Sequence, residues 1–95
     1  MPSSLRTCAE FAASLGEAIA GMRRVVAEYP TDGALGEIAA QLERLEGWTR
    51  AGSPPTLEQK GELDFGLLAS RYLHDIDGQL AGRIYEIASF VTYWS

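Results

Sequence analysis

Cysteine and histidine are almost missing from this sequence of 95 residues, which holds one of each, Cys8 and His74. One cysteine excludes an intramolecular disulfide and a zinc site built from cysteines, and it favours a reducing cytoplasm. One histidine excludes a histidine–aspartate hydrolase site, because such a site draws histidines from several helices. Cys8 and His74 could pair as nucleophile and base, but Cys8 lies on an apolar stripe, and we expect a buried, inert thiol there.

Long apolar runs and basic clusters are missing as well. No run approaches the roughly 20 residues that span a bilayer, and residues 1–8 lack the features of a signal peptide, so we expect neither membrane insertion nor export. The formal charge is −5. Residues 1–50 carry five basic and seven acidic side chains, and residues 51–95 carry three and six. This balance disfavours nucleic acid and anionic membranes as partners, because phosphate binding uses clustered Lys and Arg.

No segment shows the alternation of apolar and polar residues that marks a half-buried strand, and apolar residues instead recur at helical spacings of three and four. The first stripe predicts a long helix that Ser3 or Ser4 caps and Pro30 ends. Its members are Leu5, Cys8, Ala12, Leu15, Ile19, Met22, Val26 and Tyr29. Asp32 is a candidate cap for a second helix, whose stripe is Leu35, Ile38, Leu42, Leu45 and either Trp48 or Thr49.

A loop at 51–55 separates these helices from the second half of the chain. Thr56 and Gln59 have the spacing of a capping box, which predicts a third helix to Leu73 with a kink near Gly61. We expect its inward side chains to be Leu57, Leu63 and Leu67, with Phe65, Leu68 and Ser70 as further candidates. Gly66 and Ala69 would let a neighbouring helix approach closely. Asp75 or Asp77 can cap a fourth helix with the stripe Leu80, Ile84, Ile87, Val91 and Trp94.

The sequence therefore predicts an all-α fold, a compact antiparallel bundle of about four helices at roughly 4–29, 33–50, 56–73 and 77–94. The length suits one domain, residues 1–95, and a hydrophobic content of 46% argues against disorder.

Acidic residues are concentrated around the third helix and its exit: Glu58, Glu62, Asp64, Asp75, Asp77 and Glu86. Tyr72 and Tyr85 accompany them. Such residues form either a solvated helix face or a recognition surface for a basic protein, where charge speeds encounter and tyrosines act as anchors. His74 beside Asp75 is better explained by a helix end facing water than by a metal site. We expect no catalytic residue, no metal and no cofactor.

One group of positions resembles a known family. It comprises Leu63-x-x-Gly66-x-x-Ala69 and Asp77-x-x-Leu80, together with Tyr29-Pro30 and Gln41-Leu42 with Leu45. Over residues 11–91 the chain resembles the small helical immunity proteins that protect type VI-secreting bacteria from their own NAD(P)+-hydrolysing effector toxins. At the corner it departs from that pattern, with Leu73-His74-Asp75-Ile76 and Gly78 where a more acidic run and a proline are expected.

The resemblance implies a bacterial cytoplasmic protein that docks on a cognate toxin domain and blocks its active site. We expect Asp64, Tyr72, His74, Asp75 and Asp77 at the partner-binding surface, with Glu62 and Tyr85 as secondary candidates, in a protein that is a monomer or weak homodimer when free. Two other classes remain. One is a helical adaptor or homodimerising regulatory module without a toxin partner, and the other is an enzyme with a site made of carboxylates alone.

Overall fold

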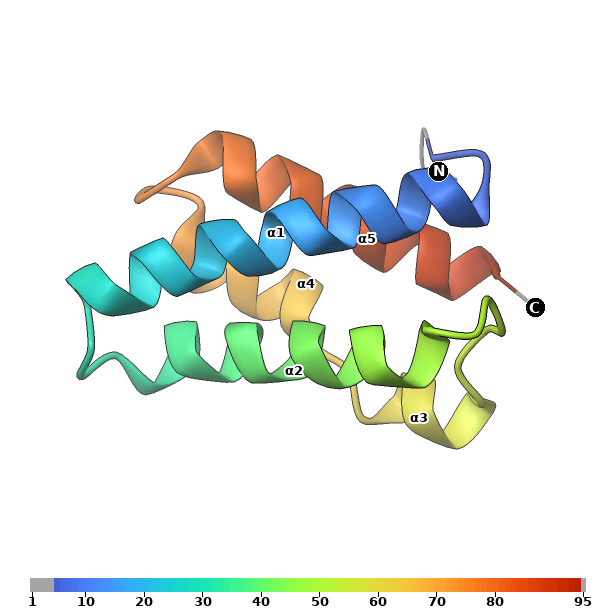
Figure 1. Ribbon diagram of the computed structural model, residues 1–95. Coiled ribbons are helices and arrows are strands. Elements are labelled where there is room, and N and C mark those ends of the chain that lie inside the picture. The colour runs from blue at the N-terminus through green and yellow to red at the C-terminus, as the bar shows by residue number, and fades with distance from the viewer. Residues whose placement is uncertain (1–4, 95) are drawn as a thin grey trace.

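The computed structural model describes residues 5–94 and is all-α, with no strand in that range (Figure 1). Its elements follow one another as α1 (Cys8–Glu28), α2 (Gly33–Thr49), α3 (Leu57–Gly61), α4 (Phe65–Leu68), the π-helical turn η1 (Ala69–Leu73) and α5 (Gly78–Tyr93). The first, second and fourth predicted helices correspond to α1, α2 and α5. None of the helices in the described range is long and apolar enough to cross a membrane.

The helix starts are fixed by side chains that accept hydrogen bonds from otherwise unpaired backbone N–H groups. Asp32 accepts from the N–H groups of Ala34 and Leu35 at the start of α2. Thr56 and Gln59 form the predicted capping box of α3. The cap of α1 is Thr7, whose hydroxyl accepts from the N–H of Glu10; the predicted caps Ser3 and Ser4 lie outside the described residues.

Four helical rods, α1, α2, α5 and α4 with η1, enclose the core. In Figure 1, α1 runs antiparallel to α2 and to α5, and α4 lies between α2 and α5. Both α4 and η1 pack against α2 and α5. The largest fully buried side chains come from all four rods: Phe11, Leu15, Met22, Leu35, Ile38, Leu42, Leu45, Leu73, Ile84 and Ile87. Burial of this apolar surface is the main source of stability.

The third predicted helix is not continuous, and its inward face was assigned correctly only in part. The helix breaks between Gly61 and Phe65. The short helix before the break, α3, has no buried residue, and its Leu57 is 86% exposed. Leu67, also expected inside, is 54% exposed. The buried row consists of Phe65, which was among the predicted candidates, with Ala69 and Leu73. The predicted Leu63 and Leu68 are partly buried against the core.

The π-helical turn explains how this row stays in line. Its members are four residues apart, and in an α-helix of 3.6 residues per turn each step of four would rotate the side chain by about 40°. In η1 the backbone widens, with the His74 N–H donating to the Ala69 carbonyl five residues back at 2.9 Å. The wider turn compensates the rotation, and the row remains directed at the core.

The first helix also departs from its predicted stripe. Cys8 and Ala12 are exposed, and the expectation of a buried thiol is therefore wrong. Phe11 is buried in their place, because its ring stacks on Phe90 at a centroid distance of 4.8 Å and meets Trp94 edge-on at 5.2 Å. These aromatic contacts tie the start of α1 to the end of α5.

Two glycines permit the closest approaches between helices. A Cβ atom at Gly66 would lie 3.1 Å from the Cβ of Ala88, where α4 meets α5. A Cβ atom at Gly21 would lie 2.8 Å from a methyl of Leu80, where α1 meets α5. The predicted close approach at Gly66 and Ala69 is confirmed, since Ala69 is fully buried.

Candidate protein-binding surface

The seven residues expected at a partner surface lie along one stretch of the chain and its neighbour in α5, but they occupy different local settings. Glu62 and Asp64 precede α4, Tyr72 belongs to η1, and His74 and Asp75 follow it directly. Asp77 precedes α5 and Tyr85 lies within it. All are exposed except Tyr85, which is partly buried against the core.

Asp64 is held by a hydrogen-bond network that the sequence did not indicate. The amide of Gln41 in α2 donates to the Asp64 carboxylate at 2.6 Å, and its oxygen accepts from the Asp64 backbone N–H at 2.8 Å. The same amide nitrogen donates to Glu37 at 2.9 Å. Gln41 is a buried polar residue on the apolar face of α2, three residues after Ile38, and that position was the available signal. One role of Asp64 is therefore to anchor the start of α4 to α2.

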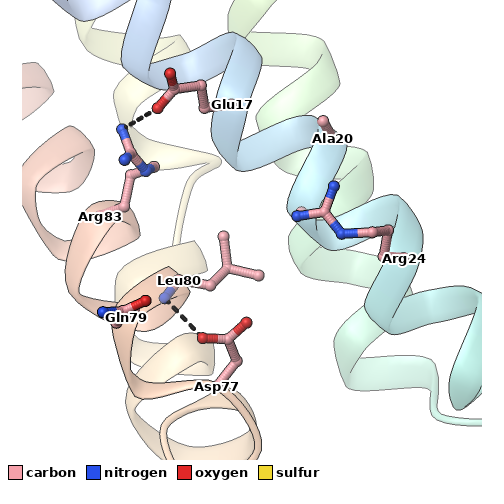
Figure 2. Close-up of a pocket in the computed structure, with 8 residues that line it drawn as sticks. Glu17, Ala20, Arg24, Asp77, Gln79, Leu80 and Arg83 are labelled. Atoms are coloured by element: carbon pink, nitrogen blue, oxygen red, sulfur yellow. Dashed lines mark hydrogen bonds and ion pairs between the residues drawn. The ribbon is translucent and has the colours of Figure 1, made fainter.

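Asp77 also has an internal role. Its carboxylate accepts from the N–H of Leu80 at 3.0 Å and so caps α5, as predicted. A groove of about 610 Å³ lies between α1 and α5. Asp77 is at one end of it (Figure 2). At the other end Arg83 pairs with Glu17 at 2.6 Å and donates to the hydroxyl of Ser14 at 3.3 Å. The carboxylates of this groove are thus engaged with groups of the protein itself.

His74 is placed beside α5. Its Nδ1 lies 3.4 Å from the hydroxyl of Tyr85, and the two rings are roughly parallel at a centroid distance of 6.4 Å. This contact brings two of the predicted residues together and connects the end of η1 to the middle of α5. It leaves the His74 side chain on the exterior.

Tyr72 and Asp75 lie with His74 on what we call the outer face, the exposed side of α4, η1 and the following turn, whereas Glu62 lies outside it at the end of α3. The exposed members of the outer face are Leu67, Ser70, Arg71, Tyr72, His74, Asp75 and Ile76. Leu67 and Ile76 were not expected here, since Leu67 was assigned to the core and Ile76 to no site. The outer face therefore combines the predicted acidic and aromatic groups with apolar side chains.

Comparison with known proteins identifies the family of the chain. The family model Tsi6 matches residues 10–93, which is nearly the whole chain. The chain belongs to the Tsi6 family. Tsi6 is the type VI secretion immunity protein family for NADase effectors, and the match confirms the resemblance seen in the sequence. No curated protein and no solved structure matches the chain.

Membership in the Tsi6 family implies that the chain has a protein partner, an effector. The chemistry of the described residues suits a binding role. No group of three or more histidine, cysteine, aspartate or glutamate side chains within residues 5–94 is placed to hold a metal ion. Asp64 and Asp77 are engaged in hydrogen bonds that position helices. The side chains of Asp75 and Arg71 form no hydrogen bond or ion pair with another described residue.

Proposed function

We propose that the protein is an immunity protein that binds a cognate NAD(P)+-degrading effector toxin in the bacterial cytoplasm and blocks the toxin's active site. The observation that carries this proposal is the match of the Tsi6 family model to residues 10–93. Inhibition by occlusion requires a stable body and a complementary exterior. It requires no chemistry from the inhibitor.

The charge of the chain supports the choice of partner. A toxin that holds the pyrophosphate of NAD(P)+ presents cationic groups in its cleft, and an inhibitor of net charge −5 is attracted to them. Such attraction raises the association rate and disfavours acidic partners. A standard interface buries about 800 Å² on each side. That is roughly a seventh of the 5636 Å² of accessible surface here, so one face of the bundle is large enough.

Glu62, Asp64, Tyr72, His74, Asp75, Asp77 and Tyr85 remain the candidate contact residues. The structure divides them by how a substitution would act. Replacing Asp64 or Asp77 would remove a hydrogen bond that positions a helix, so a loss of binding there would combine a structural and a direct effect. Tyr72 and Asp75 have no such internal bond and are the informative positions.

The test requires a purified NAD(P)+-degrading toxin domain, which is to be sought among the genes that neighbour the gene for this protein. NAD(P)+ consumption is followed while the immunity protein is titrated, and we expect activity to end near one equivalent, with a stable complex in size-exclusion chromatography. Pre-incubation of the toxin with excess NAD(P)+ should slow the onset of inhibition, because substrate and inhibitor would compete for the same cleft. An unrelated acidic helical protein serves as the control. Continued hydrolysis at saturating immunity protein, or the lack of any complex, would contradict the proposal.

A further inference from the structure

Exposed apolar side chains are unevenly distributed over the described residues. The large ones are Tyr29, Leu57, Leu67, Tyr72, Ile76 and Tyr93. Tyr29, Leu57 and Tyr93 lie on or beside three different helices, whereas Leu67, Tyr72 and Ile76 fall within residues 67–76 and are 54%, 47% and 39% exposed. Scattered apolar residues are normal on a protein surface, but a concentration of them is typical of an interaction site.

These three side chains share the outer face. Along this segment residues four apart point the same way, because Phe65, Ala69 and Leu73 are all buried. Tyr72 and Ile76 therefore form one row on the exterior. Leu67, Arg71 and Asp75 form the adjacent row. The apolar residues are thus neighbours. Arg71 and Asp75, which form no ion pair, lie beside them.

The charge around this face is negative. Residues 58–77 hold five carboxylates against Lys60 and Arg71. The ammonium group of Lys60 is engaged within the protein, where it donates to the backbone carbonyl of Trp94. A cluster of exposed apolar groups with an acidic surround is complementary to a cationic cleft that has an apolar wall, as a site for a nucleotide with an aromatic base would have.

We propose that the outer face of α4 and η1 is the part of this protein that enters the toxin's nucleotide cleft, with Tyr72 and Ile76 as apolar anchors and Asp75 as the partner of a cationic group. This inference rests on the proposed function and names the surface that performs it. Tyrosine anchors at the centre of an interface often carry most of the binding free energy.

The α1–α5 groove is the rival surface (Figure 2). It is lined largely by polar side chains, and Arg83 is neutralised by Glu17. Of the two arginines that line the groove, Arg24 forms no ion pair with a residue in the range 5–94, and its positive charge would repel a cationic cleft. For the partner proposed here, the groove is therefore the less complementary of the two surfaces.

The experiment compares matched substitutions in the intact protein, with the dissociation constant for the toxin domain measured by calorimetry. Tyr72→Ala is paired with Tyr93→Ala, which removes the same side chain from a 62% exposed position in α5. Asp75→Lys is paired with Glu28→Lys, which makes the same charge change at an exposed position at the end of α1. Circular dichroism melts verify that each variant is folded.

We expect Tyr72→Ala and Asp75→Lys each to raise Kd by about tenfold or more, and both controls to change it by less than about threefold. Unchanged binding of both outer-face variants would overturn the inference. So would a change in Kd from Arg24→Glu, in either direction, that exceeds the change from both outer-face variants, because it would assign docking to the groove. A concentration-dependent homodimer that Tyr72→Ala disperses without changing toxin affinity would assign the face to self-association and also overturn it. If the wild-type protein itself fails to bind the toxin, the proposed function fails first.

Discussion

Gln41 shows how one buried polar side chain determines the position of a functional segment. Its amide satisfies the carboxylate and the backbone N–H of Asp64 with two hydrogen bonds, and it also reaches Glu37. Asp64 directly precedes α4. These bonds therefore fix the position of α4, and of the outer face that it carries, relative to α2. Buried polar groups that are fully paired in this way specify one arrangement and are costly to disrupt.

At this scale we predict that Gln41→Ala lowers the free energy of unfolding by about 2 kcal/mol, since it leaves the Asp64 N–H without its partner and opens a small void. Urea denaturation followed by circular dichroism measures the change. Gln79→Ala is the control, because Gln79 is exposed, and it should stay within about 0.5 kcal/mol of the wild type. Equal stability of the two variants would show that the network contributes nothing.

Residue-scale features divide into those that local sequence encodes and those that it does not. Asp32 and Thr56 were expected as caps, and Asp77 was one of two candidates with Asp75. The structure confirms Asp32, Thr56 and Asp77, because a cap depends on residues at most three positions away. Cys8 was wrongly expected inside. Periodicity placed Cys8 and Ala12 inside, but the contact of Phe11 with the ring of Phe90, which is distant in sequence, determines which side of α1 is buried there.

Among the elements, α4 with η1 is the one that packing shapes most. Its sequence offers two rows at a spacing of four, Leu63 with Leu67 and Phe65 with Ala69 and Leu73, and periodicity alone does not choose between them. The second row is buried because Gly66 lets α4 approach α5 at Ala88 and small Ala69 fits beneath. The fold class and most helix positions followed from sequence; this face followed from a contact with α5, some 20 residues further along the chain.

The close approach makes a prediction at the level of the element. Gly66→Leu should destabilise the protein by about 1–3 kcal/mol, because its side chain would push against Ala88 and separate α4 from α5. Gly16→Ala is the opposite case. A Cβ atom there meets nothing within 4 Å, so the higher helix propensity of alanine should stabilise α1 by about 0.5–1 kcal/mol. Thermal melts of both variants test the pair, and a stabilising Gly66→Leu would disprove the account of this contact.

The whole molecule is held together unevenly. The rods α1, α2, α5 and α4 with η1 each contribute buried side chains to one core, whereas α3 buries none and depends on its capping box and on Lys60. Local stability follows the number of buried contacts, so the bundle and its short peripheral helix should open with different free energies. The outer face belongs to the stable part, which suits a surface that must present a fixed shape.

Amide hydrogen exchange should reveal this difference. We expect the amides of α3 to exchange at least about tenfold faster than those in the middle of α1, α2 and α5, because opening α3 exposes almost no apolar area. Mass spectrometry of peptic peptides covering residues 57–61 and 38–45 is sufficient for the comparison. Equal protection of the two peptides would mean that α3 unfolds only with the bundle.

The thiol exposed near the start of α1 has a practical consequence. Since the chain holds no second cysteine, a maleimide dye or spin probe attaches at one defined position without any prior mutagenesis. Complex formation can then be watched in real time with an otherwise unaltered molecule, and distances from that fixed origin to labels on the captured effector would orient one molecule against the other.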